Sequence, residues 1–231
     1  MTANTQHPNA QYNVARPDSL PIRVAAHQRR KMFAAFLKAM DIAPGSTLLD
    51  VGATSDTSYD HSNYLEAWYP DKKSVTAVGI DDAVFLETLY PGMTFVKADG
   101  RNLPFAAAAF DYVHSSAVLE HVGSAAMQAQ FLRELWRVAR AGVFVTTPNR
   151  WFPIEFHTVL PLLHWLPVEL HRDILRKLGH EMLAKEENLN LLSAGTLRRA
   201  AQRAGMENIR IASVSLLGLP TNLLLIAKKA P

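Results

Sequence analysis

The sequence predicts an α/β fold with a mostly parallel sheet of seven strands, helices on both faces and an antiparallel last strand. Short apolar runs alternate with amphipathic segments from residue 46 onward, as strands and crossover helices do in parallel sheets. Two further apolar runs close the chain in the order of an antiparallel hairpin. With 231 residues, 48% of them hydrophobic, the chain can bury one sizeable core. We therefore expect one elaborated domain.

The first part of the chain predicts an arm followed by a helix. Residues Met1–Pro21 are polar and interrupted by prolines, which is typical of an N-terminal arm. Residues Ile22–Met40 carry apolar side chains near helical spacing, so we expect a leading amphipathic helix at the start of a domain that spans 22–231. We interpret its basic run, His27–Lys31, as a solvated face.

The alternating pattern gives each further element a position. The predicted strands are Thr47–Val51, Val75–Ile80, Thr94–Lys97, Asp111–His114 and Ala141–Thr147, with closing strands inside residues 204–215 and 221–229. The predicted helices are Ala83–Leu89, Ala125–Arg140 and a segment that Ser193 or Thr196 caps and that ends at Ala204. Prolines at 153, 161 and 167 forbid one long helix between the last two. We expect a cap of short helices there, inserted at about residues 149–180.

Composition narrows the function classes. The formal net charge of +3 is a weak hint of anionic partners, but it is too small to be a nucleic-acid signature, so we do not expect a nucleic-acid partner. Without cysteine the chain has no disulfide, thiolate metal site or cysteine nucleophile. No signal peptide and no apolar run of membrane-spanning length is visible. We therefore expect a cytoplasmic protein without a membrane span.

Three acidic residues stand at the ends of three successive predicted strands. Asp50, Asp81 and Asp99 end the first, second and third of these strands. Because ligands of open α/β sheets bind at the carboxyl ends of the strands, we expect the three side chains to converge there. A carboxylate after the second strand suits a ribose diol, and one after the third suits an adenine amino group. Each residue taken singly is more often a turn or helix-capping Asp.

The turn Gly52–Asp56, with the sequence GATSD, argues against a phosphate-bearing nucleotide. Sites for nicotinamide dinucleotides or ATP need the glycine-rich motifs GxGxxG or GxxxxGK[ST] to cradle phosphates, and neither is present. S-adenosylmethionine has an adenosine but no phosphate, and its cationic groups favour a binding site lined by acidic side chains. The sequence therefore favours this cofactor and disfavours an NAD-dependent dehydrogenase.

At this point the sequence resembles the class I S-adenosylmethionine-dependent methyltransferases, especially the broad bacterial group with an LEHV signature. The resemblance rests on LLDVG, VGIDD, FVKADGRNLPF, FDYVHSSAVLEHV, FLRELWRVAR and FVTTPNR, which follow one another between Ser46 and Arg150. It implies a Rossmann-like fold and the activity of a methyltransferase. The family usually has a second and often a third glycine where this chain has Ala53, Thr54 and Ser55.

The resemblance also implies cofactor-binding roles for matched positions. Asp50 and Gly52 would shape the turn under the methionine and adenosine, and Asp81 would hold the ribose. The remaining matched residues are Asp99, Gly100 and Arg101 at the adenine, and Ser115 and Ser116 at the methionine end.

The methyl acceptor is less constrained by the sequence. A hydroxyl acceptor needs a base, for which His121 is the first candidate, His157 the second and His114 the third. Glu155, His157 and His164 could be imagined as metal ligands, but the insert lacks a regular ligand spacing such as HExxH, so we expect no metal. Each of these residues has a structural reading as well, in helix-start hydrogen bonding or in cap packing.

We expect transfer to oxygen, or less favourably to carbon or nitrogen, of a small, partly apolar metabolite. HSSA stands where many amino-directed methyltransferases carry an Asn/Asp-Pro-Pro-Tyr/Phe tetrapeptide, and the cap is rich in tryptophan, phenylalanine and leucine. Those apolar residues suit packing on the core equally well. Two alternatives stay open: a non-catalytic binding or regulatory protein of the same fold, and an RNA methyltransferase that uses Arg29, Arg30 and Lys31.

Overall fold

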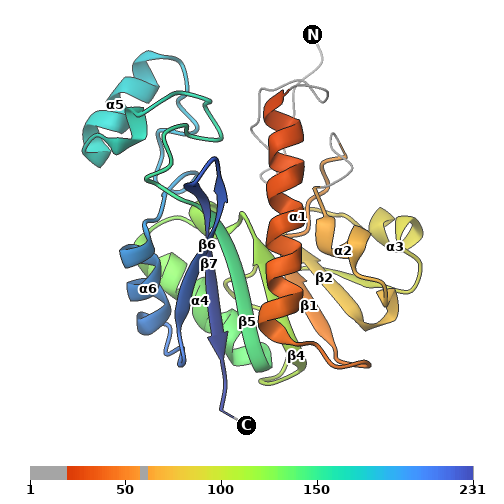
Figure 1. The fold of residues 1–231 in the computed structure, drawn as a ribbon. Coiled ribbons are helices and arrows are strands. Elements are labelled where there is room, and N and C mark those ends of the chain that lie inside the picture. Colours follow the sequence, from red (N-terminus) through yellow and green to blue (C-terminus); the bar gives the residue numbers. More distant parts are fainter. Residues whose placement is uncertain (1–19, 58–61, 231) are drawn as a thin grey trace.

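A central sheet organises the computed structural model, which describes residues 20–57 and 62–230 (Figure 1). Its strand order is β3-β2-β1-β4-β5-β7-β6. The strands are β1 (Leu48–Val51), β2 (Val75–Gly79), β3 (Thr94–Lys97), β4 (Phe110–Ser116), β5 (Ala139–Pro148), β6 (Arg210–Leu216) and β7 (Leu219–Lys228). Neighbours among β1 to β5 are parallel, whereas β7 runs antiparallel to both β5 and β6. The predicted seven-stranded sheet with its antiparallel last strand is confirmed.

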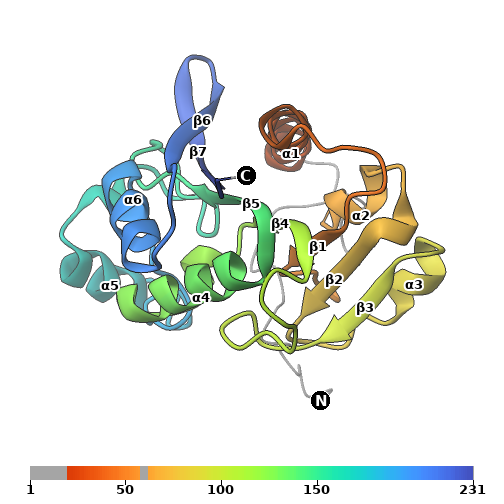
Figure 2. The same ribbon diagram turned by 90° about the horizontal axis from the view of Figure 1, so that it is seen from below.

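Helices cover both faces of this sheet, as predicted (Figure 2). Helices α1 (Leu20–Met40), α2 (Tyr64–Trp68) and α3 (Phe85–Leu89) lie on one face, and α4 (Ala125–Val138) and α6 (Ala194–Arg203) lie on the other. Each face buries its own apolar cluster. Phe36 and Leu65 belong to the first cluster, and Phe131 and Leu197 belong to the second. This double burial explains why every residue of the central strand β1 is buried.

Both long helices of the second face begin at a capping side chain. The Ser124 hydroxyl accepts a hydrogen bond from the Met127 amide at the start of α4. At α6, Ser193 and Thr196 form a reciprocal capping box, so both residues proposed as caps take part. Such caps satisfy amides that a helix cannot pair internally, and they fix where each crossover helix starts.

The segment after β5 forms a separate cap above the carboxyl end of the sheet (Figure 1). It holds the short helix η3 (Leu163–Trp165) and helix α5 (Val168–Lys177), and no single long helix, as the prolines predict. Leu175, Leu183 and Leu189 belong to its own small core. The packing thus continues past residue 180 to the start of α6.

Several boundaries differ from those that the sequence predicts. Helix α1 begins at Leu20, two residues before the predicted start, and residues 1–19 of the predicted arm lie outside the described residues. Strand β4 continues through Ser115 and Ser116, which the sequence analysis placed beyond it. Helix α4 ends at Val138 because strand β5 already begins at Ala139.

The basic run on α1 is partly used by the fold. Gln28 is buried, the Lys31 ammonium donates to the carbonyl of Ser215, and the Arg30 guanidinium lies 5.8 Å from the Trp68 ring centre. These contacts leave less of the run available to a nucleic acid than a fully solvated face would. Among the described residues, no helix has both the length and the apolar content to cross a membrane.

Candidate active site at the carboxyl edge of the sheet

The turn after β1 has its backbone amides satisfied by the protein itself. The amides of Gly52 and Ala53 both donate to the carbonyl of Val78, at 2.8 and 2.9 Å. The amide of Thr54 donates to Asn63 Oδ1 at 2.8 Å, and Asn63 Nδ2 donates back to the Thr54 carbonyl at 3.0 Å. A phosphate cradle needs such amides pointing at the ligand. This turn therefore suits a ligand that brings no phosphate.

Gly52 occupies a position that excludes a side chain for two reasons. Its φ is +117°, a conformation that residues with a Cβ rarely adopt. A Cβ at this position would also lie 2.0 Å from Cγ2 of Val118. The glycine thus allows the β1 turn to pack against the segment that follows β4.

Asp50 points into a buried polar cluster below this turn. Its Oδ1 lies 2.5 Å from Nδ1 of His114, and the Nε2 atom of that ring lies 2.9 Å from the Tyr64 hydroxyl. Burial lowers the pKa of His114 to about 4, so the ring is neutral near pH 7. The neutral ring donates from Nδ1 to Asp50 and accepts from Tyr64. His114, the third candidate base, therefore has both nitrogens occupied and is 1% exposed.

A second carboxyl group, Glu66 on α2, lies in the same cluster. It is fully buried, and neither of its carboxyl oxygens has a hydrogen-bond partner among the described residues. Burial and the nearby charge of Asp50 raise the pKa of Glu66 well above its usual range. Burial also raises the pKa of Asp50 to about 7. The cluster therefore holds a neutral Glu66 next to the Asp50–His114 pair.

The two acids after β2 and β3 lie nearer the surface. Asp81 is half-buried, two residues past the end of β2. Asp99 accepts from the amide of Arg101 at 2.8 Å, and its Oδ2 lies 2.6 Å from the guanidinium of the same residue. These hydrogen bonds to Arg101 lower the pKa of Asp99, so its carboxylate is ionised. The carboxylate is fixed in place and keeps acceptor capacity for a further donor.

Three smaller residues at this edge are held by packing or by hydrogen bonds. A Cβ on Gly100 would lie 2.4 Å from the Phe131 ring, so this position requires glycine. The Ser115 hydroxyl is fully buried and donates to the carbonyl of Val51 at 2.7 Å. The Ser116 hydroxyl lies 2.8 Å from that of Thr146. Both serine hydroxyls thus connect β4 to its neighbouring strands.

The two histidines proposed as bases, His121 and His157, are brought together although 36 positions separate them. Their Nε2 atoms lie 3.0 Å apart. Nδ1 of His157 lies 2.6 Å from Oε1 of Glu155, and Nδ1 of His121 lies 2.6 Å from the carbonyl oxygen of Asn188. Because a carbonyl only accepts, the proton of neutral His121 is on Nδ1. Its Nε2 then presents a lone pair to His157.

Burial and neighbouring charges shift the pKa values of Glu155, His157 and His121 in different directions. Burial opposes ionisation of Glu155, but the His157 charge and hydrogen bonds hold the pKa of Glu155 at about 2. Burial alone would lower the pKa of His157, yet the Glu155 carboxylate raises it above its usual value. Burial and then the neighbouring His157 lower the pKa of His121 to about 4. The row Glu155–His157–His121 therefore has, at one end, a carboxylate that favours the charged form of its histidine neighbour and, at the other end, a neutral imidazole.

Glu120 completes this cluster and was not selected by the sequence analysis. It precedes His121 in the short helix η2 (Leu119–His121) and is fully buried. Its Oε2 accepts from the Thr147 hydroxyl at 2.9 Å, while Oε1 has no hydrogen-bond partner among the described residues and lies 3.9 Å from Nε2 of His121. A carboxylate beside a histidine within an apolar run was the signal available in the sequence.

Comparisons with known proteins identify the central part of the chain. A family model described as a methyltransferase domain matches residues 49–146, a range that begins within β1 and ends within β5. The core of this chain is a class I S-adenosylmethionine-dependent methyltransferase domain. It is thus an enzyme domain of the transferase class, and S-adenosylmethionine is its cofactor.

Solved structures share the fold of this methyltransferase at low sequence identity. A SAM-dependent methyltransferase from Aquifex aeolicus has 15% identity and a TM-score of 0.57, over 91% of this chain and 99% of that chain. One from Mesorhizobium loti has 16% identity and a TM-score of 0.55, over 86% and 98%. PigF with SAH has 21% identity and a TM-score of 0.52, over 91% and 60%. A search of curated protein sequences found no match.

The residues of this methyltransferase fit its cofactor. The amides of the β1 turn are already satisfied, and carboxylates follow the ends of β2 and β3. Carboxylates suit the hydroxyls, the amino group and the positive charges of S-adenosylmethionine, which offers no phosphate for free amides to bind. This chain has Ala53, Thr54 and Ser55 where the family usually has further glycines. Here Thr54 and Asn63 close the turn through two paired hydrogen bonds.

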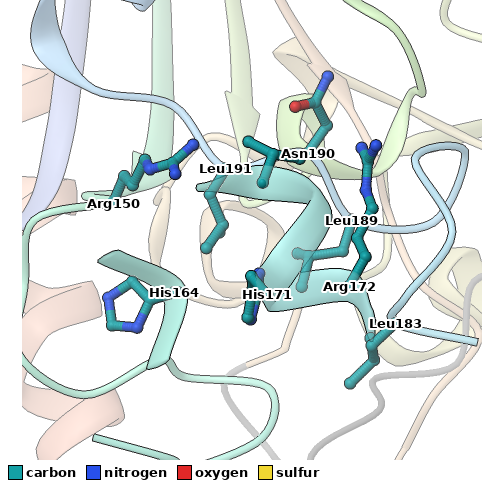
Figure 3. A pocket seen from close by; sticks show the side chains of 9 residues that line it. Arg150, His164, His171, Arg172, Leu183, Leu189, Asn190 and Leu191 are labelled. Atoms are coloured by element: carbon teal, nitrogen blue, oxygen red, sulfur yellow. The ribbon is translucent and has the colours of Figure 1, made fainter. Parts of the chain in front are cut away.

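The methyltransferase also has a recess in its cap (Figure 3). The recess lies between α5 and residues 183–191, and Arg150 and Arg172 give its lining two basic groups beside His164, His171 and several leucines. Burial lowers the pKa of Arg150, and no ion pair of its guanidinium occurs among the described residues. The outer surface of the cap exposes the apolar rings of Trp151 and Trp165.

Proposed function

We propose that this methyltransferase transfers the methyl group to an oxygen atom of a small, partly apolar metabolite. The observation that carries the proposal is the row Glu155–His157–His121, whose members lie 2.6 and 3.0 Å apart beside the segment that follows β4. S-adenosylmethionine supplies the methyl group as an electrophile on a positively charged sulfur. The chain's own residues must therefore orient the acceptor and accept its proton.

A hydroxyl acceptor gives this row a function. A hydroxyl oxygen becomes a good nucleophile when its proton leaves, whereas a neutral amine already has a lone pair for attack. When His157 is neutral, Nε2 of His121 or His157 can take that proton, and Glu155 orients His157 and stabilises the charged form that results. The side chain of His121 is 28% exposed, so an acceptor can reach it. The segment HSSA at the end of β4 also lacks the tetrapeptide typical of amino-directed enzymes.

The cap supports an acceptor that is partly apolar. Exposed apolar side chains gather on it, and its recess combines leucines with basic groups. The exposed residues include Trp151, Ile154, Val159, Leu162 and Trp165. A ring or chain with a hydroxyl and a nearby anionic group matches these two surfaces, because the guanidinium of Arg150 can bind a carboxylate or phosphate in two-pronged fashion.

For the cofactor we propose roles at the carboxyl edge. Asp81 accepts the hydrogen bonds of the ribose diol, and Asp99 accepts that of the adenine amino group, while Arg101 keeps Asp99 in position. The other proposed cofactor-binding residues are Asp50, Gly52, Gly100, Ser115 and Ser116, which shape the surface through the packing and hydrogen bonds described above.

Two variants separate cofactor binding from proton removal. Asp81→Ala should weaken S-adenosylmethionine binding by about 1–3 kcal/mol, a factor of roughly 5 to 150, in titration calorimetry. Glu155→Gln should bind the cofactor normally and lower kcat for a hydroxylated acceptor by at least tenfold, because His157 loses its charged partner. Mass spectrometry of products from a panel of phenols, hydroxy acids and amines identifies the methylated atom.

Two exposed carboxylates outside the proposed site provide matched control variants. Asp71→Ala removes an exposed carboxylate that caps nothing through its side chain, and Glu181→Gln alters an exposed glutamate of the cap. Both should behave as wild type. Unchanged cofactor affinity in folded Asp81→Ala would refute the ribose role. Products methylated only on nitrogen or carbon would overturn the oxygen acceptor.

A further inference from the structure

Three potential metal-binding atoms converge beside the end of β4. Oε1 of Glu120, Nε2 of His121 and Nε2 of His157 all lie within 4.8 Å of one another. Two ligands of a tetrahedral ion at 2.0–2.1 Å lie about 3.3 Å apart. The two Nε2 atoms are 3.0 Å apart, and Oε1 of Glu120 is 3.9 Å from Nε2 of His121. Small side-chain rotations bring the three atoms to this spacing.

Each of the three side chains is fixed from behind by a hydrogen bond. Asn188 accepts from Nδ1 of His121, the Glu155 carboxylate accepts from Nδ1 of His157, and the Thr147 hydroxyl donates to Oε2 of Glu120. These bonds hold the imidazole protons on the Nδ1 atoms and turn the Nε2 lone pairs inward. Metal-binding histidines in proteins have such carbonyl and carboxylate partners behind them.

A hydrogen bond between the two histidines does not account for the buried Oε1 atom of Glu120. A single proton between the two Nε2 atoms satisfies both rings but not Oε1, which is buried without a hydrogen bond among the described residues. An unpaired buried carboxylate oxygen is costly. A cation placed between the three atoms satisfies all of them at once.

We propose that Glu120, His121 and His157 bind one divalent transition-metal ion. Two imidazoles and one carboxylate suit Zn²⁺, Mn²⁺, Fe²⁺ or Co²⁺, whereas Mg²⁺ and Ca²⁺ prefer oxygen ligands throughout. The ligands come from η2 and from the cap, 36 residues apart, so no regular helical spacing marks them in the sequence. For this reason the sequence alone predicts no metal.

Three protein ligands leave open positions on the ion for water or an acceptor. With both Nε2 atoms bound to it, an ion at this place would replace the histidines in proton removal. It would lower the pKa of a hydroxyl that binds to it, and the released proton would pass to solvent water. The methyl group then forms its bond to that oxygen, while the electron pair of the broken carbon–sulfur bond stays on sulfur. This role of the ion rests on the proposed oxygen acceptor, whereas the binding of the ion does not.

Cobalt binding tests the site without cofactor or acceptor. Untagged protein, treated with a chelator and dialysed, is titrated with Co²⁺ and followed by its visible absorption bands. We expect one ion per chain. Glu120→Gln and His157→Gln should each weaken binding at least tenfold, while His27→Gln, which changes an exposed histidine on α1, should bind as wild type does. Circular dichroism confirms that each variant is folded.

A second measurement keeps the test valid if a variant does not fold. In the wild-type protein, bound Co²⁺ should shift or broaden the ring NMR signals of two histidines and leave His27 unchanged. Absence of Co²⁺ and Zn²⁺ binding at millimolar concentration, or full binding by folded Glu120→Gln and His157→Gln, would overturn the metal site. Metal binding without methylation of any hydroxyl would instead remove the proposed oxygen acceptor.

Discussion

Single buried carboxyl groups determine how the stability of this methyltransferase depends on pH. Glu66 is the strongest case, because it is fully buried and its pKa is raised well above the usual value. A group whose pKa is raised by folding stabilises the native state below its unfolded pKa. This contribution is lost as the pH rises towards the native pKa, because the unfolded chain releases the proton first.

Glu66→Gln should therefore flatten the pH dependence of stability. An amide cannot ionise, so the variant gains on the wild type by up to about 1.4 kcal/mol for each pH unit above the unfolded pKa. Urea denaturation at pH 5, 6, 7 and 8 measures the difference. The slope that remains in the variant includes the contribution of Asp50, whose pKa is raised to about 7, and those of His114 and His121, whose pKa values burial lowers to about 4.

Glu207→Gln, an exposed change of the same kind, serves as the control and should follow the wild type at every pH. A constant difference between Glu66→Gln and the wild type from pH 5 to pH 8 would show that Glu66 is already ionised in the folded protein. The proposed neutral Glu66 would then be wrong.

At the scale of elements, the turn after β1 and the segment after β4 constrain each other. Gly52→Ala adds a methyl group 2.0 Å from Val118 at a φ of +117°, so it should destabilise the fold by roughly 2–4 kcal/mol. Gly45→Ala provides the control, because its φ is +82° and nothing lies within 4 Å. Chemical denaturation compares the two variants.

The double variant Gly52→Ala/Val118→Ala separates steric overlap from backbone strain. Gly45→Ala measures the cost of backbone strain alone. Shortening Val118 should recover the additional free energy of unfolding that Gly52→Ala loses beyond this cost. If Gly52→Ala costs no more than Gly45→Ala, the overlap with Val118 is relieved by backbone movement and the two segments are not coupled.

Local sequence signals predict most elements but not how polar groups pair across them. The apolar periods of α4 and the central strands are local, and so they predict these elements well. Ser115 and Ser116 resemble loop residues, yet their hydroxyls bond to the neighbouring strands and extend β4. The contact between Asp50 and His114 spans 64 positions and has no local signature.

The candidate site shows the same division. Patterns at the ends of strands predict Asp81 and Asp99, because parallel strands share an edge. His121 and His157 were selected singly as bases, but their contact depends on the fold of the cap, and Glu120 was not selected. Arg101 was expected at the adenine, whereas its ion pair with Asp99 became visible only in the structure.

At the scale of the whole molecule, the cap and the sheet should differ in local stability. Helices α5 and α6 have ten residues each, but α5 packs on a core of few leucines, whereas α6 packs on α4 and the main core. Segments with less buried apolar area open more often. Amides of α5 should therefore exchange hydrogen for deuterium faster than those of α6, as mass spectrometry of peptides can measure. Equal protection would mean that cap and sheet open together.

The interior place of β7 has a consequence for synthesis on the ribosome. This strand is the last in sequence, yet it pairs with β5 on one side and β6 on the other. A nascent chain that has already extruded residues up to β6 still has an unpaired β5 edge, and the apolar run of β7 must arrive before β6 can join the sheet. Unpaired strand edges promote association between chains. A stalled chain that ends before residue 219 should therefore depend on chaperones more than the full-length chain does.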